Sequence, residues 1–206
     1  MGSSVPEITV VIPHRMDENA SITLESLSKQ TFDGFGVLII PDEGKGSNWA
    51  RNEGFKQVKT EFVLFSDNDI TWKSNALQKL LTVLKAHPKA SYSYGRYKKG
   101  NGVYCHRAWD PLFLTTVENF ISTMSLVRTK DLPNPPFDES IKRLQDYDLW
   151  LNMWLNYGRR GVYCEDLIFE TPNKIGITDA SFDNYDEATK VLNKKYALNL
   201  PLFGSP

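Results

Sequence analysis

Short apolar runs alternate with segments of helical periodicity in the first half of the chain. The runs are rich in β-branched residues and end at turn residues, a pattern typical of strands buried on both faces of a sheet. They cover Ile8–Pro13, Phe35–Ile40 and Phe62–Ser66. The segment after each run has apolar residues three or four positions apart, which predicts a helix. These helices are expected at Ser21–Gln30, at Ser47–Lys59 with Ser47 or Asn48 as cap, and at Ser74–His87.

This strict alternation of strand and helix predicts parallel strands joined by right-handed crossovers. It is the order of a nucleotide-binding α/β half, in which ligands bind at the carboxyl ends of the strands. We therefore expect a Rossmann-like α/β/α domain with a mixed, mostly parallel central sheet.

The second half of the chain is less regular but still patterned. We expect a hairpin, a short helix, a strand, an amphipathic helix closed by Gly158, a further strand and a last helix. Their ranges are Tyr92–Tyr94 with Val103–Cys105, Phe113–Phe120, Ile121–Arg128, Ser140–Tyr157, Gly161–Phe169 and Asp186–Tyr196. No linker interrupts the pattern, so residues 1–206 are expected to form one domain.

Composition narrows the range of partners. The chain of 206 residues has 41% hydrophobic and 24% charged residues, as soluble globular proteins do. Its net charge of −1 argues against a broad nucleic-acid interface. Cys105 and Cys164 show no metal-ligand spacing and are expected to be free thiols of a reducing compartment. With neither a signal peptide nor an apolar run long enough to span a membrane, we expect a cytoplasmic protein.

Two carboxylates follow the third apolar run directly. Asp67 and Asp69 are two positions apart, so in an extended chain their side chains project to the same side. Hard oxygen donors at the end of a buried strand suit Mg²⁺ or Mn²⁺, and such an ion suits a diphosphate. The alternative is a simple polar turn, because Asp and Asn are frequent in turns.

A glycine-containing loop precedes the second helix. Gly44-Lys45-Gly46 lacks the third glycine of a dinucleotide fingerprint and the Gly-Lys-Ser/Thr of a P-loop. Arg51 lies near the start of the helix, where a cation opposes the helix dipole. We therefore expect a partner for Arg51, either a phosphate or one of the carboxylates of Glu18, Asp42 and Glu43.

A second pair of carboxylates begins the amphipathic helix. Asp146 and Asp148 are also two positions apart, but on a helix they point in different directions and cannot chelate one ion. Only Asp146, near the helix start, is a candidate active-site group. Alternatively, both residues simply favour the first turn of a helix.

Four motifs occur in an order that resembles glycosyltransferase family 2. They are Val10–Pro13, Ile39–Gly44, the Ala-Arg-Asn-x-Gly sequence Ala50–Gly54 and the Asp-x-Asp sequence Phe65–Asp69. Further on, Phe137–Glu139 and Gln145–Trp150 resemble the acceptor-side signature of the same family. The resemblance implies a GT-A fold and a metal-dependent glycosyltransferase that moves a sugar from a nucleotide-sugar, commonly UDP-linked, to an acceptor hydroxyl with inversion. It divides the domain into a nucleotide-binding half (about 1–90), an acceptor and metal half (about 91–180) and a C-terminal helix and tail (181–206).

The resemblance also implies roles for individual residues. Asp69 would bind Mn²⁺ or Mg²⁺ directly, and Asp67 would reach the metal or the ribose. Asp146 would be the catalytic base that deprotonates the acceptor. The remaining residues expected to contact the nucleotide-sugar are Pro13, His14, Arg15, Asp42, Arg51 and Asn68.

Several positions depart from the family pattern. Gln145 stands where relatives carry Glu, Asn152 where many carry Arg, and His14-Arg15 where many carry Thr-Tyr. The sequence Phe169–Lys174 replaces the usual Tyr-x-x-His ending, with Lys174 as a possible substitute. These departures keep a second hypothesis open, a catalytically silent UDP-sugar-binding module. A nucleotidyltransferase is a further alternative, although residues 14–19 are not the basic glycine-rich loop that it requires.

Aromatic and basic residues are interleaved between Tyr92 and Trp109. Such a stretch can bind single-stranded nucleic acid, or it can border sugar ligands through stacking rings. A hairpin with one buried aromatic face and one solvated charged face explains the same pattern.

Overall fold

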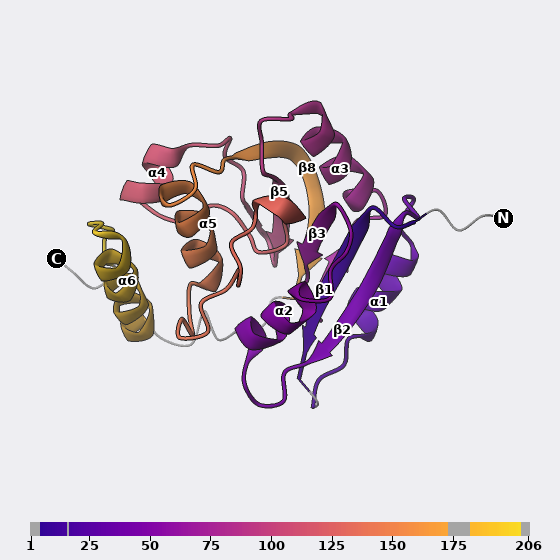
Figure 1. The fold of residues 1–206 in the computed structure, drawn as a ribbon, viewed down its shortest axis with the longest axis horizontal. Helices are drawn as coiled ribbons and strands as arrows, with labels where there is room; N and C mark the ends of the chain where they lie inside the picture. The colour runs from indigo at the N-terminus through magenta and orange to yellow at the C-terminus, as the bar shows by residue number, and fades with distance from the viewer. Residues whose placement is uncertain (1–4, 16, 173–181, 203–206) are drawn as a thin grey trace.

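An eight-stranded mixed sheet is covered by helices on both faces (Figure 1). The computed structural model describes residues 5–15, 17–172 and 182–202. The strands are β1 Ile8–His14, β2 Phe35–Pro41, β3 Phe62–Phe65, β4 Thr71–Trp72, β5 Tyr92–Lys99, β6 Gly102–Tyr104, β7 Leu126–Arg128 and β8 Gly161–Thr171. The helices are α1 Ser21–Ser28, α2 Ser47–Phe55, α3 Ala76–Ala86, α4 Pro111–Thr116, α5 Gln145–Leu155 and α6 Phe182–Tyr196, with a 3₁₀ turn at Thr129–Asp131.

The strand order β2-β1-β3-β7-β5-β8-β4, with β6 paired to β5, confirms the predicted class. Strand β1 pairs in parallel with β2 and with β3, as the alternating first half predicts. Strand β5 is parallel to β8, while β7 runs antiparallel to both β3 and β5. The longest pairings are therefore parallel, and the carboxyl ends of β1, β2 and β3 meet at one edge of the sheet.

The core has two parts, one on each face of the sheet. In β1, Val10 packs on the side of α1 and α3, while Val11 packs on the side of α5. Phe62 and Leu64 of β3 likewise share the α3 side, and Phe65 shares the α5 side. This alternation follows from the two-residue period of a strand, and it explains why these central strands are apolar without interruption.

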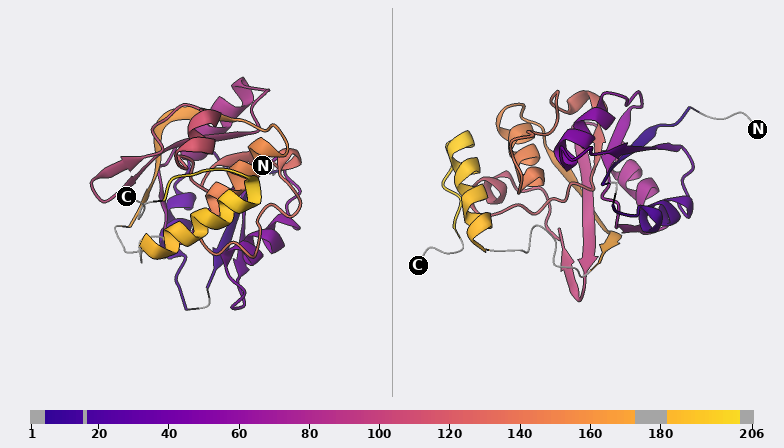
Figure 2. Two further views of the ribbon diagram at one scale, coloured as in Figure 1. Left: turned by 90° about the vertical axis from the view of Figure 1, so that its left-hand side faces the viewer. Right: turned by 90° about the horizontal axis from the view of Figure 1, so that it is seen from below.

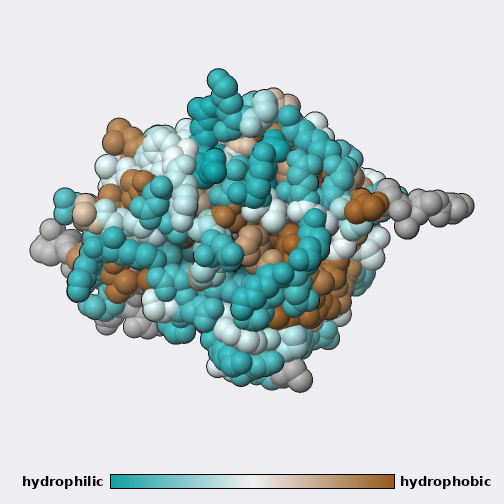
Figure 3. Space-filling view, viewed as in Figure 1, coloured by the Kyte–Doolittle hydropathy of each residue, from teal (hydrophilic) through white to brown (hydrophobic). Residues whose placement is uncertain are grey.

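Strand β2 differs from its prediction as a strand buried on both faces. It is the edge strand of the sheet and is only partly covered, with Ile39 41% exposed. Figure 3 shows brown, apolar surface in the region where Figure 1 draws β2. Periodicity alone cannot separate an edge strand from a central one when both are continuously apolar.

Several predicted elements have different bounds or caps in the structure. The amphipathic helix begins at Gln145 rather than Ser140, because Leu144 has a left-handed backbone with φ 61°. Only Leu126–Arg128 of the predicted strand 121–128 pairs in the sheet. Helix α2 is preceded by Gly46, with φ 96°, so the expected caps Ser47 and Asn48 are its first residues.

The aromatic and basic stretch forms the β5–β6 hairpin, but its aromatic side is only partly buried, with Tyr104 46% exposed. It protrudes from the body of the molecule, at the bottom of the right-hand view in Figure 2. The Tyr97 ring stacks on Phe169 at 4.8 Å and on Tyr104 at 5.3 Å between ring centroids, while Tyr92 and Tyr94 are buried. Within the described residues, no helix has the length and apolar character needed to cross a membrane.

Candidate functional site

The expected site residues of the first half gather at the carboxyl edge of β1, β2 and β3. His14, the last residue of β1, lies opposite Pro41 of β2, and its carbonyl accepts a hydrogen bond from the Asp42 amide at 2.9 Å. Strand β3 pairs with β1 up to Val11 and Phe65, so Asp67 follows at the same edge. Pro13 is buried and lies beyond the β3 pairing, where its missing amide proton costs no ladder bond on that side.

Helix α1 holds the turn that contains Asp67 and Asp69. The hydroxyl of Thr23, which is fully buried, donates toward the carbonyls of Asp67 and Ile70 at 3.1 and 3.0 Å and accepts from the Ile70 amide at 2.8 Å. Ser26 accepts from the Trp72 amide at 3.0 Å. The backbone between the two carboxylates is therefore fixed, while both side chains are only partly buried.

Arg51 pairs with Asp67, a partner that sequence reasoning missed. Its Nη2 donates to Asp67 Oδ1 at 2.8 Å, whereas Glu18, Asp42 and Glu43, the expected carboxylates, contact other groups. The Arg51 side chain is only 6% exposed, and its Nε is buried without a hydrogen-bond partner among the described residues. A buried, unpaired guanidinium N–H suits an anionic ligand at this edge.

The rest of the Ala-Arg-Asn-x-Gly sequence joins α2 to its surroundings. Asn52 donates to the Phe137 carbonyl at 2.9 Å and accepts from the Phe137 amide at 3.0 Å. Asn48, just before the motif, donates to the carbonyls of Asp138 and Ile141, both at 2.9 Å. Gly54 lies so close to β1 that an added Cβ would be 2.4 Å from Val11 Cγ1. Each fixed position of the motif thus has a structural reason, namely an ion pair, a loop anchor or close packing.

Asp146 lies in the first turn of α5 and faces the same cluster. Its Oδ2 accepts from Asn119 Nδ2 at 2.9 Å, and its Oδ1 accepts from the Tyr147 amide at 2.8 Å. Burial raises the pKa of Asp146 to about 6, the charge of Arg51 opposes this rise, and the charge of Asp67 adds to it. A carboxylate with such a pKa can take up a proton near neutral pH.

Asp148 points elsewhere, as helix geometry predicts. It is 3% exposed, and its Oδ1 accepts from Lys195 Nζ and Tyr196 Oη of α6, both at 2.8 Å. The two carboxylates of the second pair therefore serve different parts of the molecule. Asp148 anchors α6, and Asp146 faces the cluster with Arg51 and Asp67.

The other residues expected to contact the nucleotide-sugar lie at the ends of these strands and in the loops that follow them. Asp42 Oδ1 accepts from the Gly44 amide at 3.1 Å, and Asn68 donates to Glu18 Oε2 at 2.6 Å. Arg15 is exposed and pairs with Asp17 at 3.0 Å. The Nδ1 atom of His14 is buried and has no hydrogen-bond partner in the part of the chain that the structure describes. Lys174, a possible substitute for the missing histidine, lies outside the described residues.

The donor set suits a divalent ion only in combination with a ligand. No group of three or more His, Cys, Asp or Glu side chains that could hold a metal is present among the described residues. Asp67 and Asp69 provide two carboxylates, of which Asp67 already neutralises Arg51. Mg²⁺ is commonly held by one or two carboxylates together with water and substrate phosphates. The residues fit an ion that arrives with a diphosphate.

The residues that sequence reasoning missed are those that position the site. Thr23 holds the turn of Asp67, Asn48 and Asn52 hold the loop around residues 137–141, and Asn119 contacts Asp146. Asn48, Asn52 and Thr23 are buried polar residues on helices. The only available signal in the sequence is a polar side chain on the apolar face of a helix.

Comparison of the sequence with protein families and with known proteins finds glycosyltransferases. The family model described as glycosyl transferase family 2 matches residues 10–135. The chain is 22% identical over 187 residues to the Escherichia coli protein named UDP-Glc:alpha-D-GlcNAc-diphosphoundecaprenol beta-1,3-glucosyltransferase WfgD, covering 76% of this chain and 73% of that protein.

Solved structures are similar in fold. S. aureus TarS 1–349 has a TM-score of 0.69 at 18% identity, covering 92% of this chain but 65% of that one. The same protein in complex with UDP-GlcNAc has a TM-score of 0.71 at 19% identity, with 92% and 66% covered. The mannosyltransferase PcManGT from Pyrobaculum calidifontis, in complex with GDP-Man and Mn²⁺, has a TM-score of 0.61 at 13% identity, covering 90% of this chain and 61% of that one. The chain thus spans slightly less than two thirds of TarS 1–349, and these likenesses show the GT-A fold that the sequence predicts.

Proposed function

The chain belongs to glycosyltransferase family 2, and from this premise we propose that it transfers a sugar from a UDP-sugar to an acceptor hydroxyl. The observation that carries the proposal is the cluster of Arg51, Asp67 and Asp146 at the carboxyl edge of the sheet. This is where α/β proteins bind their ligands. A relative whose name includes UDP-Glc and a fold neighbour in complex with UDP-GlcNAc support the choice of donor.

The donor side of the site uses the loops after β1, β2 and β3. In this proposal Asp42, which follows β2, and His14, the last residue of β1, contact the nucleoside. Arg51, with its unpaired Nε, provides positive charge for the diphosphate. Pro13, Arg15 and Asn68 complete the proposed contacts along the same edge.

Asp69 and Asp67 would hold a Mn²⁺ or Mg²⁺ ion together with the diphosphate. Such an ion, when bound, stabilises the negative charge that develops on the leaving nucleoside diphosphate. The ion pair with Arg51 fixes Asp67 Oδ1. In this proposal Asp69 binds the ion directly.

Asp146 acts as the general base in this proposal. With a pKa of about 6, Asp146 is mostly ionised at neutral pH. It is also more basic than an ordinary carboxylate, which suits it to accept the proton of an acceptor hydroxyl. The proton moves from the acceptor oxygen to the Asp146 carboxylate as that oxygen attacks the anomeric carbon. Attack from the side opposite the diphosphate inverts that carbon.

A thermal-shift panel of nucleotide-sugars with and without Mn²⁺ tests the donor assignment. A ligand that binds only the folded state raises the melting temperature. The proposal predicts stabilisation by UDP-sugars in the presence of Mn²⁺ and little effect of GDP- or ADP-linked sugars. Equal stabilisation by all nucleotides would contradict the choice of UDP. A UDP-sugar that binds but is not consumed with any acceptor would favour the catalytically silent binding module.

A further inference from the structure

A large basic groove lies where strands β5 and β8 begin, at the end of the sheet opposite the candidate active site. Its volume is about 880 Å³, within the range of small-molecule sites. Its lining includes Lys89, Trp109, Lys130, Trp154, Arg159 and Arg160. We call this surface the basic groove.

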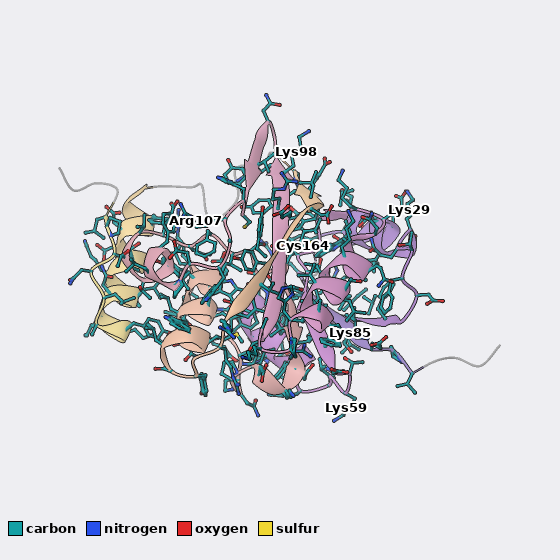
Figure 4. The ribbon with its side chains drawn as sticks, turned by 90° about the horizontal axis from the view of Figure 1, so that it is seen from above. Lys29, Lys59, Lys85, Lys98, Arg107 and Cys164 are labelled. Carbon is teal, nitrogen blue, oxygen red and sulfur yellow. The ribbon has the colours of Figure 1, made fainter. Side chains whose placement is uncertain are left out.

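The strand pairings place the basic groove away from the carboxyl edge. Strands β5 and β8 begin side by side at Tyr92 and Gly161, and the Ser91 amide donates to the Arg160 carbonyl at 2.8 Å. The groove is therefore at the edge where these strands start, whereas Asp67 and Asp42 follow strand ends. In Figure 4, Lys98 of the β5–β6 hairpin marks one end of the sheet, and Lys85 and Lys59 mark the other.

The groove concentrates positive charge in a chain whose net charge is −1. Five Lys and Arg residues line it, against a single carboxylate, Asp131. Arg128 is committed to the fold, because it donates to the carbonyls of Ala90 and Leu84 at 3.0 and 2.9 Å. Of the other four, Lys89, Lys130 and Arg160 are exposed, and none of these three forms an ion pair with a carboxylate of the described residues.

The guanidinium group of Arg159, which also lines the groove, lacks a hydrogen-bond partner for one of its nitrogens among the described residues. Its Nη2 is 3.5 Å from Asp131 Oδ1, and its Nε is buried without a hydrogen-bond partner among the described residues. A buried guanidinium N–H without an acceptor costs free energy, which an anionic oxygen in the groove would offset.

The backbone that presents the arginines is already fixed. The turn after α5 contains a left-handed Gly158, with φ 64°, whose amide donates to the Trp154 carbonyl at 2.9 Å. The Arg159 amide donates to the Met153 carbonyl at 2.8 Å. This helix C-terminal turn holds Arg159 and Arg160 beside Trp154 without requiring a ligand to order them.

Two partly exposed indole rings form the apolar wall of the groove. Trp109 and Trp154 are 5.7 Å apart between centroids at an interplanar angle of 74°. Flat aromatic faces pack against the C–H surface of a sugar ring, and guanidinium and ammonium groups bind phosphate oxygens. We propose that the basic groove binds a phosphorylated saccharide at a site separate from the donor site.

Calorimetric titration of glucose 1-phosphate, with glucose and inorganic phosphate as separate probes, tests this proposal. The variant K130E/R160E reverses two exposed charges of the groove, and K142E/K194E makes the same charge change at exposed lysines elsewhere. We expect glucose 1-phosphate to bind the wild type and K142E/K194E equally, and K130E/R160E at least about tenfold more weakly. Circular dichroism melts of each variant confirm that it is folded.

Each probe decides a different part of the proposal. Glucose and phosphate are both expected to bind at least about tenfold more weakly than glucose 1-phosphate. Phosphate that binds as tightly as glucose 1-phosphate would overturn the saccharide assignment. Absence of binding at about 10 mM, equal binding by K130E/R160E, or displacement by UDP with Mn²⁺ would overturn the separate site. The donor-site proposal is untouched by any of these results, because it rests on the other edge of the sheet.

Discussion

Arg51 of helix α2 donates to Asp67, in the turn after β3, at 2.8 Å. The pair connects the Ala-Arg-Asn-x-Gly sequence to the Asp-x-Asp sequence, two motifs that lie on different connections of the sheet. Its electrostatic consequence is that the Arg51 cation offsets the charge of Asp67 before any ligand binds. The same arginine also lowers the pKa of Asp146, so one cation acts on both Asp67 and Asp146.

Replacing Arg51 by Met should therefore destabilise the protein. The change keeps most of the apolar side-chain volume but leaves the part-buried Asp67 without its cation. We expect a loss of about 1–3 kcal/mol in the free energy of unfolding, measured by urea denaturation. Lys56→Met, directly after the same helix, is the control, because its ion pair with Glu53 is exposed and should contribute less than about 1 kcal/mol. Equal effects of both changes would mean that the Arg51 pair has no special structural role.

Gly54→Ala tests the close approach of α2 to β1. The new methyl group would be 2.4 Å from Val11 Cγ1 and 3.1 Å from Ile40 Cγ1, so α2 or β1 must shift. Overpacking of this kind costs about 1–3 kcal/mol. Gly36→Ala in β2 is the matched control, since an added Cβ there meets no atom within 4 Å. A thermal melt of Gly54→Ala that coincides with that of Gly36→Ala would contradict the packing explanation.

Asp146→Asn should make the protein more stable at neutral pH. Burial raises the pKa of Asp146 to about 6 from its ordinary value of 3.8, so between these values the folded state binds more protons than the unfolded state. The contribution of this residue to stability consequently falls as pH rises from about 4 to about 6, and it stays low above pH 6. Asparagine removes that penalty, and we expect a gain of about 1–3 kcal/mol at pH 7.5 and little change at pH 4.

Asp148→Asn is the control for this pH effect, because Asp148 binds Lys195 and Tyr196 and its replacement should destabilise the protein. Urea denaturation at several pH values measures both variants.

The pH dependence of catalysis by Asp146 should be opposite to that of stability. The rate of transfer by the wild type should fall as pH drops below an apparent pKa of about 6, and Asp146→Asn should lose transfer while retaining UDP binding. Transfer by Asp146→Asn at the wild-type rate would exclude Asp146 as the base.

The sequence was sufficient to predict the parts of the fold that depend on local pattern. Continuous apolar runs identified β1 and β3, and the polar residues after β3 identified the turn of Asp67 and Asp69. The left-handed Leu144 could not be foreseen, because a leucine in a helical pattern has no local reason to leave it. Its conformation shortens α5 so that Asp146 falls in the first turn.

Long-range polar contacts were beyond sequence reasoning. Glu18, Asp42 and Glu43 were the carboxylates expected to pair with Arg51, but the folded sheet brings Asp67 to it instead. Asn119 and Asp146 come from different elements and meet only in the tertiary structure. The motifs therefore located the site, and the fold determined how its side chains are paired.

Calorimetric titration of UDP into the wild type and into Asp69→Ala, with Mn²⁺ and with EDTA, tests the central claim most directly. The account predicts that the wild type binds UDP with Mn²⁺ and loses most of this affinity in EDTA. It also predicts that Asp69→Ala binds weakly under both conditions, while Asp146→Asn binds like the wild type. Binding of UDP that is independent of metal and unchanged in Asp69→Ala would contradict the metal–diphosphate site after β3.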